Sequence, residues 1–432
     1  MRARTIIATL VILCGVSPHL AVGQREPANQ ILLKAGRLLD IKAGRYVEDA
    51  AVLIDGERVT EVGPAADLAM RATRARVIDW HFATVLPGLI DCHTHLMARM
   101  GHGNDGYVLS LATKSEAFRA LEGAADARLT LTAGFTTVRD VESEGSQYAD
   151  VALRDAINQG LVAGPRMLVS TRGIAAVGQY EPFGVSPDLI GFPTGAQMIS
   201  GAEEARRAVR EQIGNGANWI KVYADWSEPT LTVEEMKVIV EEAHKHKRKV
   251  AAHANTPEGI HNALTAGVDS IEHGHRIDRA NLELMKVQGV FLVPTVGVID
   301  ASAADLPNDE MIHKRFADFM AHIDEALKTA KTLGVKIASG FDASEAKGQG
   351  KNADELVALV KHGLTPIEAI RAATTNAAEL LGWQDRVGTV EPGKFADLIA
   401  VEGDPLADIT VLKSVKFVMK GGAVVRDSQP TP

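Results

Sequence analysis

Four histidines stand at the ends of short apolar runs, where their side chains could share metal ions. His93 and His95 end a run that begins at Leu89, and side chains two residues apart on a strand face the same side. His253 and His273 each follow a later run. Imidazoles bind divalent transition metals, and a water bound to such a metal becomes a nucleophile near neutral pH. The pattern therefore predicts a hydrolytic metal centre.

A lysine and an aspartate complete the predicted site. Lys221 lies within the mostly apolar run 219–223, where an ammonium group is unfavourable unless its charge is paired or removed. Asp342 follows the run 337–340. Taken singly, a strand-end histidine is more often a hydrogen-bonded core group, and a buried lysine more often reaches a carboxylate or solvent. Together, at five strand ends of one sheet, these residues favour a shared site.

The elements that must bring these residues together alternate between strand-like and helix-like stretches. Eight short β-rich runs are predicted as strands, at residues 89–93, 135–138, 166–170, 219–223, 249–252, 270–271, 290–293 and 335–338. Helical patterns such as 233–246 and 354–362 lie between them. This alternation predicts an α/β fold with a parallel sheet, and eight such units over about 300 residues predict a closed (β/α)8 TIM barrel. Active sites of such barrels lie at the carboxyl ends of the strands.

Both ends of the chain carry β-hairpin patterns instead. Short apolar runs near the start are followed by the turn residues Asp55 and Gly56, and similar runs recur after residue 397. We therefore expect a small composite β-sandwich domain built from residues 24–86 and 388–432, with the barrel spanning 87–387.

The first 23 residues have the pattern of a signal peptide. Arg2 and Arg4 precede an apolar run at 5–16, and small residues precede Gln24, where cleavage is expected. A retained N-terminal anchor is the alternative. With cleavage, we expect a periplasmic or secreted protein without a membrane segment, because no other stretch reaches ~18 uninterrupted apolar residues.

Composition and incomplete or absent motifs argue against several other classes of protein. The net charge of −9 argues against nucleic acid as a partner, and two cysteines exclude a disulfide-rich scaffold. The spacing from Gly388 to Lys394 imitates a phosphate-binding loop, but Phe395 stands where a serine or threonine should hold magnesium. No nucleophile elbow of the G-x-S-x-G type is present. Cys92 should point away from the metal face, which favours a core role.

Several motifs resemble the metal-dependent amidohydrolase superfamily. The stretch 87–95 resembles its opening strand, and 388–398 resembles its return into the β domain. The stretches 134–140 and 271–274 resemble the branch that holds imidazolonepropionase-like proteins and Xaa-Pro dipeptidases. Imidazolonepropionase itself is similar in outline, but it resembles proteins that bind one metal ion and lack the lysine of the fourth strand. The lysine at 221 therefore favours the dipeptidase-like, two-metal subgroup.

The resemblance implies a role for each predicted ligand. His93 and His95 would bind the first divalent metal ion, and His253 and His273 the second. Lys221 would carry a carbamate derived from CO2 and bridge both ions, because a carbamate offers oxygen ligands that an ammonium lacks. Nitrogen and oxygen ligands suit zinc, with manganese, cobalt or iron as alternatives. The resemblance also implies a homo-oligomer.

The resemblance further implies amide hydrolysis by a metal-bridging hydroxide. Asp342 would touch the first metal, take the proton of the attacking hydroxide and pass it to the leaving nitrogen. The expected substrates are dipeptides such as Xaa-Pro, or N-acyl amino acids with a free C-terminal carboxylate, including ochratoxin-type amides. Cyclic amides or other small non-peptide substrates are an alternative, and a non-catalytic binding protein on the same fold is another.

Substrate contacts are expected from residues near the strand ends. Tyr223 shares a strand face with the predicted carbamate, although packing inside the barrel is an equal alternative. Arg139 and Arg172 could hold a carboxylate, and His275 could reach the site or pack elsewhere. The long loop 171–193 could be a lid or a surface excursion.

Overall fold

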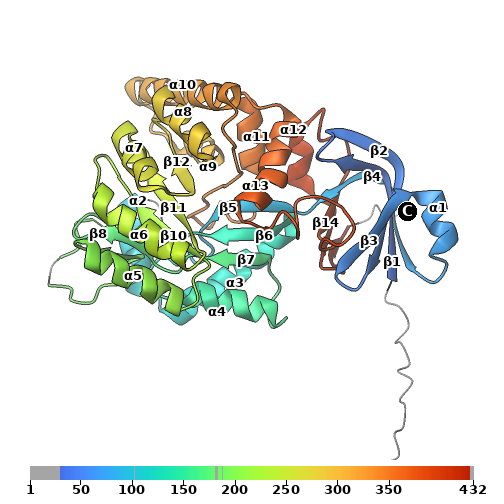
Figure 1. The fold of residues 1–432 in the computed structure, drawn as a ribbon, viewed down its shortest axis with the longest axis horizontal. Coiled ribbons are helices and arrows are strands. Elements are labelled where there is room, and N and C mark those ends of the chain that lie inside the picture. Colours follow the sequence, from blue (N-terminus) through green and yellow to red (C-terminus); the bar gives the residue numbers. More distant parts are fainter. Residues whose placement is uncertain (1–29, 102, 181–182, 187, 429–432) are drawn as a thin grey trace, which may run out of the picture.

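The computed structural model describes residues 30–101, 103–180, 183–186 and 188–428. The predicted signal peptide lies outside these residues. Among the described helices, none combines the length and apolar character needed to cross a membrane. Figure 1 shows two parts side by side, a set of strands surrounded by helices and a smaller β-rich part that contains β1–β4 and β14.

The larger part alternates strands and helices, as the sequence predicts. Within its described residues every strand pairing is parallel, in two sheets with the orders β5-β6-β7 and β13-β12-β11-β10-β8-β9. Its strands are β5 (Leu89–Thr94), β6 (Phe135–Asp140), β7 (Arg166–Val169), β8 (Gly173–Ala176), β9 (Ala196–Ile199), β10 (Trp219–Tyr223), β11 (Lys249–Ala254), β12 (Ser270–His273) and β13 (Phe291–Val293).

Backbone hydrogen bonds close the barrel between its last and first strands. The predicted eighth strand, 335–338, is reduced to a single parallel bridge between Leu292 and Ile337. On its other side, the Cys92 N–H donates to the Ser339 carbonyl at 2.8 Å. The chain after 338 therefore runs beside β5, although it forms no extended ladder there.

The third strand, predicted at 166–170, is β7, and a second segment, β8, follows it after a break. β7 pairs with β6, whereas β8 pairs with β10. Between them Thr171 has a φ of 62°, in the left-handed region, so the extended backbone is interrupted at that residue. The Thr171 N–H donates to Asp150 at 2.8 Å, and its hydroxyl donates to Gln212 at 2.8 Å, which fixes the break.

Helices cover the outside of the barrel and pack their apolar faces against the strands. They are α2 (Gly103–Thr113), α3 (Glu116–Thr132), α4 (Ala149–Asn158), α5 (Ala202–Gly214), α6 (Val233–Lys245), α7 (Pro257–Ala266), α8 (Arg279–Gln288), α9 (Val296–Ser302), α10 (Glu310–Leu333), α11 (Ala353–Lys361), α12 (Pro366–Ala372) and α13 (Thr375–Leu380), with short 3-10 helices at Ala303–Asp305 and Ile409–Ser414.

Helix α6 illustrates why these stretches are helical. Thr232 and Glu235 form a capping box, which satisfies backbone N–H groups at the start of the helix. One face then repeats apolar residues at helical spacing, and the buried members of that face are Met236, Ile239, Val240 and Ala243.

The smaller part is one hydrogen-bonded sheet drawn from both ends of the chain, in the order β16-β15-β14-β4-β1-β2-β3. Its strands, with the helix that follows β3, are β1 (Gln30–Asp40), β2 (Arg45–Asp55), β3 (Arg58–Pro64), α1 (Ala65–Arg71), β4 (Arg76–Pro87), β14 (Leu398–Val401), β15 (Phe417–Lys420) and β16 (Ala423–Asp427). The domain boundaries expected from the sequence stay a prediction.

The sheet is folded so that its two halves share a core. Trp80 of β4 and Phe417 of β15 lie two strands apart, at least about 10 Å on a flat sheet, yet their ring centroids are 5.7 Å apart. The register between β1 and β4 shifts after Ala35. Gly36 sits at this shift, and a Cβ there would overlap the His81 carbonyl. Glycine at this position therefore permits the bend that encloses the core.

We expect Trp80→Ala to destabilise the protein by about 3–5 kcal/mol, because Trp80 is fully buried between the two halves of this sheet. The measurement is the free energy of unfolding in denaturant. Val77→Ala is the matched control, because Val77 lies on the same strand and is 52% exposed. Equal stability of the two variants would contradict the shared core.

Candidate active site

A cavity of about 180 Å³ opens at the carboxyl ends of the barrel strands. Its lining includes every residue that the sequence predicted as a metal ligand, namely His93, His95, Lys221, His253, His273 and Asp342. These residues come from β5, β10, β11, β12 and the segment that closes the barrel. The structure thus brings the predicted set together.

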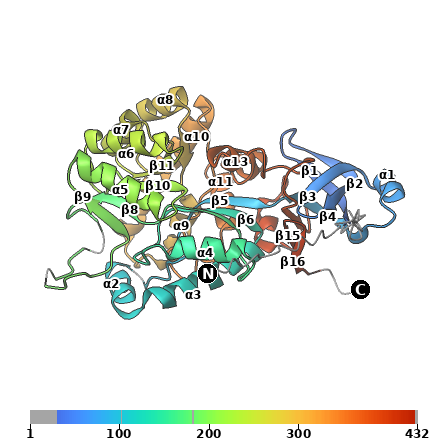
Figure 2. The same ribbon diagram turned by 60° about the horizontal axis from the view of Figure 1, so that its bottom comes forward.

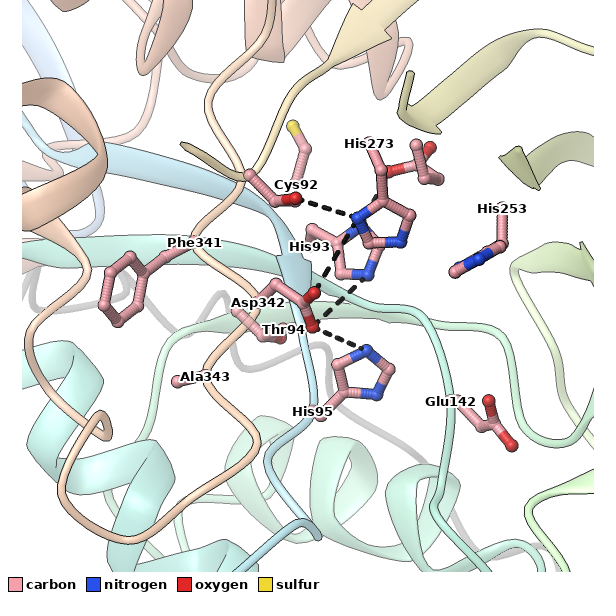
Figure 3. Close-up of polar contacts among 12 residues, drawn as sticks. Cys92, His93, Thr94, His95, Glu142, His253, His273, Phe341, Asp342 and Ala343 are labelled. Carbon is pink, nitrogen blue, oxygen red and sulfur yellow. Dashed lines mark hydrogen bonds and ion pairs between the residues drawn. The ribbon is translucent and has the colours of Figure 1, made fainter. Parts of the chain in front are cut away.

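Asp342 lies among three of the histidines. One of its oxygens is 3.7 Å from His93 Nε2 and 3.3 Å from His95 Nε2, and the other is 3.8 Å from His273 Nδ1. Figure 3 shows the three rings converging on this carboxylate. Ligand atoms of His93, His95 and Asp342 lie within 4.8 Å of one another, so these residues form a possible metal site. His253 extends the group, with its ring centroid 4.4 Å from that of His273.

Among the described residues, two nitrogens in the cavity have no hydrogen-bond partner, which fits a site for cations. His93 Nε2 is buried without a hydrogen bond. Lys221 is 1% exposed, and within the described residues no hydrogen bond or ion pair reaches its Nζ. Leaving such groups unsatisfied is unfavourable. A metal ion at His93 and a carbamate at Lys221 would remove both penalties, so the residues fit the implied group.

Burial and neighbouring charges set the protonation of these groups. Burial and the charge of Lys221 lower the pKa of His93 to about 4, and burial lowers the pKa of His253 and His273 well below the usual value. Neutral imidazole is the form that binds metals. Burial also lowers the pKa of Lys221, against the pull of carboxylates, which favours the neutral amine that can react with CO2.

Neighbouring charges shift the pKa of Asp342 and the pKa of His95 in opposite directions. Burial opposes ionisation of Asp342, but His93 and His95 hold the pKa of this carboxyl well below its usual range. Burial opposes protonation of His95, yet the carboxylates of Glu144 and Asp342 raise the pKa of that imidazole well above its usual value. The site therefore favours positive charge between His95 and Asp342.

The second nitrogen of His93 is held by a buried ion pair. His93 Nδ1 lies 2.8 Å from Glu272, and Arg139 Nη2 donates to the same carboxylate at 2.8 Å. Burial opposes ionisation of Glu272, but Arg139 and His93 hold its pKa at about 2. Arg139 is fully buried and also donates to the Cys92 carbonyl at 2.6 Å. Its expected contact with substrate is therefore corrected: the arginine orients Glu272 beneath the site.

The other histidines are oriented in the same way. His95 Nδ1 lies 2.8 Å from Glu144, which also accepts a hydrogen bond from the Tyr107 hydroxyl at 2.9 Å. His273 Nδ1 lies 2.8 Å from the Thr295 hydroxyl. Contacts of this kind fix the orientation of a ligating ring and leave its other nitrogen for the metal.

Strained backbone is concentrated at the site. Four of these residues have a φ in the left-handed region, at 49° for Glu144, 70° for His273, 50° for Thr295 and 61° for Asp342. Such conformations are unfavourable for residues with side chains and persist only where the surrounding structure enforces them. The Asp342 N–H donates to the His93 carbonyl at 2.9 Å, which holds the two residues together.

The remaining predicted substrate contacts divide into one inside the cavity and two outside. Tyr223 lines the cavity. The Arg172 guanidinium donates to the Ala196 carbonyl at 2.8 Å, and the residue is absent from the cavity lining. His275 Nε2 donates to the Pro294 carbonyl at 3.0 Å, and its ring packs against Phe319. The position of Arg172 corrects its expected role, and the position of His275 agrees with the alternative that it packs elsewhere.

Sequence reasoning missed the residues that form the rest of the cavity. Glu144 and Tyr107 line it, and Glu142 lies buried behind Tyr223. Glu142 and Glu144 continue the two-residue alternation of β6 beyond its last residue, which is the signal that could have found them.

The long loop between β8 and β9 contributes to the cavity. Its residue Tyr180 lines the cavity together with Trp226. Asn104 in α2 exchanges two hydrogen bonds with the backbone of Phe183, at 2.9 Å and 3.1 Å, so the loop is fixed to the barrel. Figure 2 shows β8, β9 and α2 at the same end of the molecule.

Comparisons with known proteins agree with this architecture. The model of the amidohydrolase family matches residues 84–425. The chain is 33% identical to an ochratoxinase from Aspergillus niger over 446 residues, which cover 94% of this chain and 89% of that protein.

Solved structures also resemble this chain over most of its length. A Xaa-Pro dipeptidase with bound methionine has a TM-score of 0.80 and 33% identity, covering 91% of this chain and 99% of that one. A prolidase complexed with N-methylphosphonate-L-proline has a TM-score of 0.78 and 31% identity, covering 92% and 100%. The protein therefore belongs to the amidohydrolase family, with the barrel fold of that family, and is a hydrolase that acts on C–N bonds.

Proposed function

We propose that this protein is a two-metal amidohydrolase that cleaves the amide bond of dipeptides, or of N-acyl amino acids, with a free C-terminal carboxylate. The observation that carries the proposal is that all the predicted ligands line one cavity, and that the lysine among them is buried without a hydrogen bond or ion pair within the described residues. The similarity to a Xaa-Pro dipeptidase and to a prolidase with a proline-based ligand supports this substrate class. No arginine is among the described residues that line the cavity, so the two predicted arginine contacts to the carboxylate are withdrawn.

In this proposal the residues divide between two cations. His93, His95 and Asp342 would hold one ion, and His253 and His273 the other. A carbamate on Lys221 would bridge them. Zinc is the ion that these nitrogen and oxygen ligands suit best, with manganese, cobalt and iron as alternatives. When bound, such ions polarise a carbonyl group and lower the pKa of water.

The chain supplies the proton transfer and the orientation. Asp342 lies at the centre of the histidines, where its carboxylate can accept a proton from the attacking water and deliver it to the leaving nitrogen. An amide nitrogen leaves poorly unless it is protonated. Glu272 and Glu144 hold the rings of His93 and His95, so the ligand atoms stay directed into the cavity.

Metal analysis tests the cation site directly. We expect about two ions per chain in protein loaded with zinc and bicarbonate, and loss of activity on chelation. Lys221→Ala should lose part of the metal, because no bridging carbamate can form. Lys336→Ala is the control, because that lysine is exposed and paired with Glu379. Unchanged metal content in Lys221→Ala would contradict the bridging role.

Asp342→Asn tests the proton transfer. We expect turnover to fall by ~10²-fold or more, because the amide cannot accept the proton, while metal remains bound. The measurement is kcat in protein whose metal content has been verified. Near-normal turnover of the metal-replete variant would remove Asp342 from the proton path.

Glu272→Gln tests the support of His93. The amide keeps the shape of the carboxylate but weakens the contact with the imidazole and with Arg139. We expect metal affinity to fall by about 10–100-fold, measured by chelator competition. Metal affinity equal to that of the unmodified protein would assign Glu272 to packing alone.

A substrate panel separates this function from its alternatives. Xaa-Pro dipeptides, N-acyl amino acids and cyclic imides are assayed with the metal-loaded protein. Hydrolysis of the first two classes supports the proposal, and exclusive hydrolysis of cyclic imides would replace it. Bound metal with no hydrolysis of any amide would overturn it.

A further inference from the structure

One side of the cavity is a cluster of phenols and carboxylates. We name it the tyrosine–glutamate wall, and its residues are Tyr107, Tyr180, Tyr223, Glu142 and Glu144. The three tyrosines and Glu144 line the cavity, whereas Glu142 is fully buried behind them. Figure 3 shows Glu142 on the side of the site away from Asp342.

The hydroxyl protons of this wall are directed into the wall itself. Tyr180 donates to one oxygen of Glu142 at 2.5 Å, and Tyr223 donates to the other. Tyr107 donates to Glu144 at 2.9 Å and is also in contact with the Tyr180 hydroxyl. A phenol has a single proton to donate. Each tyrosine oxygen therefore has only lone pairs left for the cavity.

Glycines make room for this arrangement. A Cβ at Gly195 would overlap the Glu142 carboxylate and the Tyr180 hydroxyl. A Cβ at Gly173 would lie 2.7 Å from the ring of Tyr223. Two separate backbone segments thus leave space for the buried carboxylate, and side chains at either position would displace it.

The wall also faces a cavity in which the described lining supplies no arginine for an anion. Among the described lining residues the only lysine is Lys221, whose charge the proposed carbamate removes, and no arginine is present. The aromatic faces of Tyr223 and Trp226 stack nearby, with centroids 5.1 Å apart. Lone pairs, carboxylates and aromatic faces all attract a cation.

We infer that the tyrosine–glutamate wall binds the free α-ammonium group of a dipeptide, so that the enzyme prefers dipeptides to N-acylated amino acids. An ammonium group offers three donors and no acceptor, which matches a surface of acceptors. An acyl oxygen at the same place would meet lone pairs without a donor. This inference rests on the proposed function and selects one of its two substrate classes.

Matched substrates test the inference. We expect kcat/KM for Met-Pro to exceed that for N-acetyl-Met-Pro by at least about 100-fold, because acetylation removes the positive charge and two of the three N–H donors that the acceptors of the wall would bind. Equal values, or a preference for the acetylated substrate, would overturn the inference while leaving amide hydrolysis in place.

Variants connect the preference to the wall. Glu142→Gln should reduce the preference for Met-Pro over N-acetyl-Met-Pro at least about 10-fold, mainly through KM. Tyr180→Phe should act in the same direction. Tyr148→Phe is the matched control, because Tyr148 also donates to a glutamate, Glu211 at 3.3 Å, and does not line the cavity. An unchanged preference in both wall variants would overturn the inference.

A binding measurement keeps the two proposals distinguishable. Calorimetry with metal-loaded Asp342→Asn should show tighter binding of Met-Pro than of N-acetyl-Met-Pro, and Glu142→Gln in that background should remove the difference. Selective binding of Met-Pro without hydrolysis by the unmodified protein would support the wall and overturn the proposed function. Equal binding or no binding of both ligands would overturn the inference.

Discussion

The main constraint on the site is that it buries side-chain nitrogens that lack hydrogen-bond partners. His93 Nε2 has no hydrogen-bond partner, and within the described residues the buried Lys221 Nζ has no hydrogen bond or ion pair, with the centroid of the Tyr223 ring 5.3 Å away. Burying such groups is unfavourable unless something common to them supplies the missing interactions. In the proposed function, shared cations and a modified lysine would meet that requirement, which would account for the lysine on an apolar strand and for the imidazoles gathered in one cavity.

Backbone hydrogen bonds of the barrel hold these buried side chains together. The segment after residue 338 lies beside β5, and the Asp342 N–H bonds to the His93 carbonyl. Residues far apart in the chain are therefore held within a few ångströms. The β-rich part supports the same strand, because β4 leads directly into β5 and the Gly88 N–H between them donates to the Asp397 carbonyl at 2.8 Å. Both ends of the chain thus fix the start of the strand that carries the first two histidines.

A second set of contacts orients the groups of the site. Carboxylates behind the site are held by an arginine or by phenols, and in turn they orient imidazoles or tyrosines. The Glu272 carboxylate lies between Arg139 and His93, and the Glu144 carboxylate lies between Tyr107 and His95. Charged groups in this layer neutralise or polarise one another; Glu272 is fully buried beneath the cavity, whereas Glu144 lines it.

The sequence by itself determined the alternation of strands and helices and the identity of the metal-binding candidates. Both follow from local rules, because side chains alternate along a strand and parallel strands end on one face of a barrel. Arg139 shows where that reasoning stops: its position at a strand end was visible, but its partner Glu272 is distant in the chain. Only the tertiary structure decided which ring nitrogen faces the cavity and which phenol meets which carboxylate, because those contacts join residues from separate loops and strands.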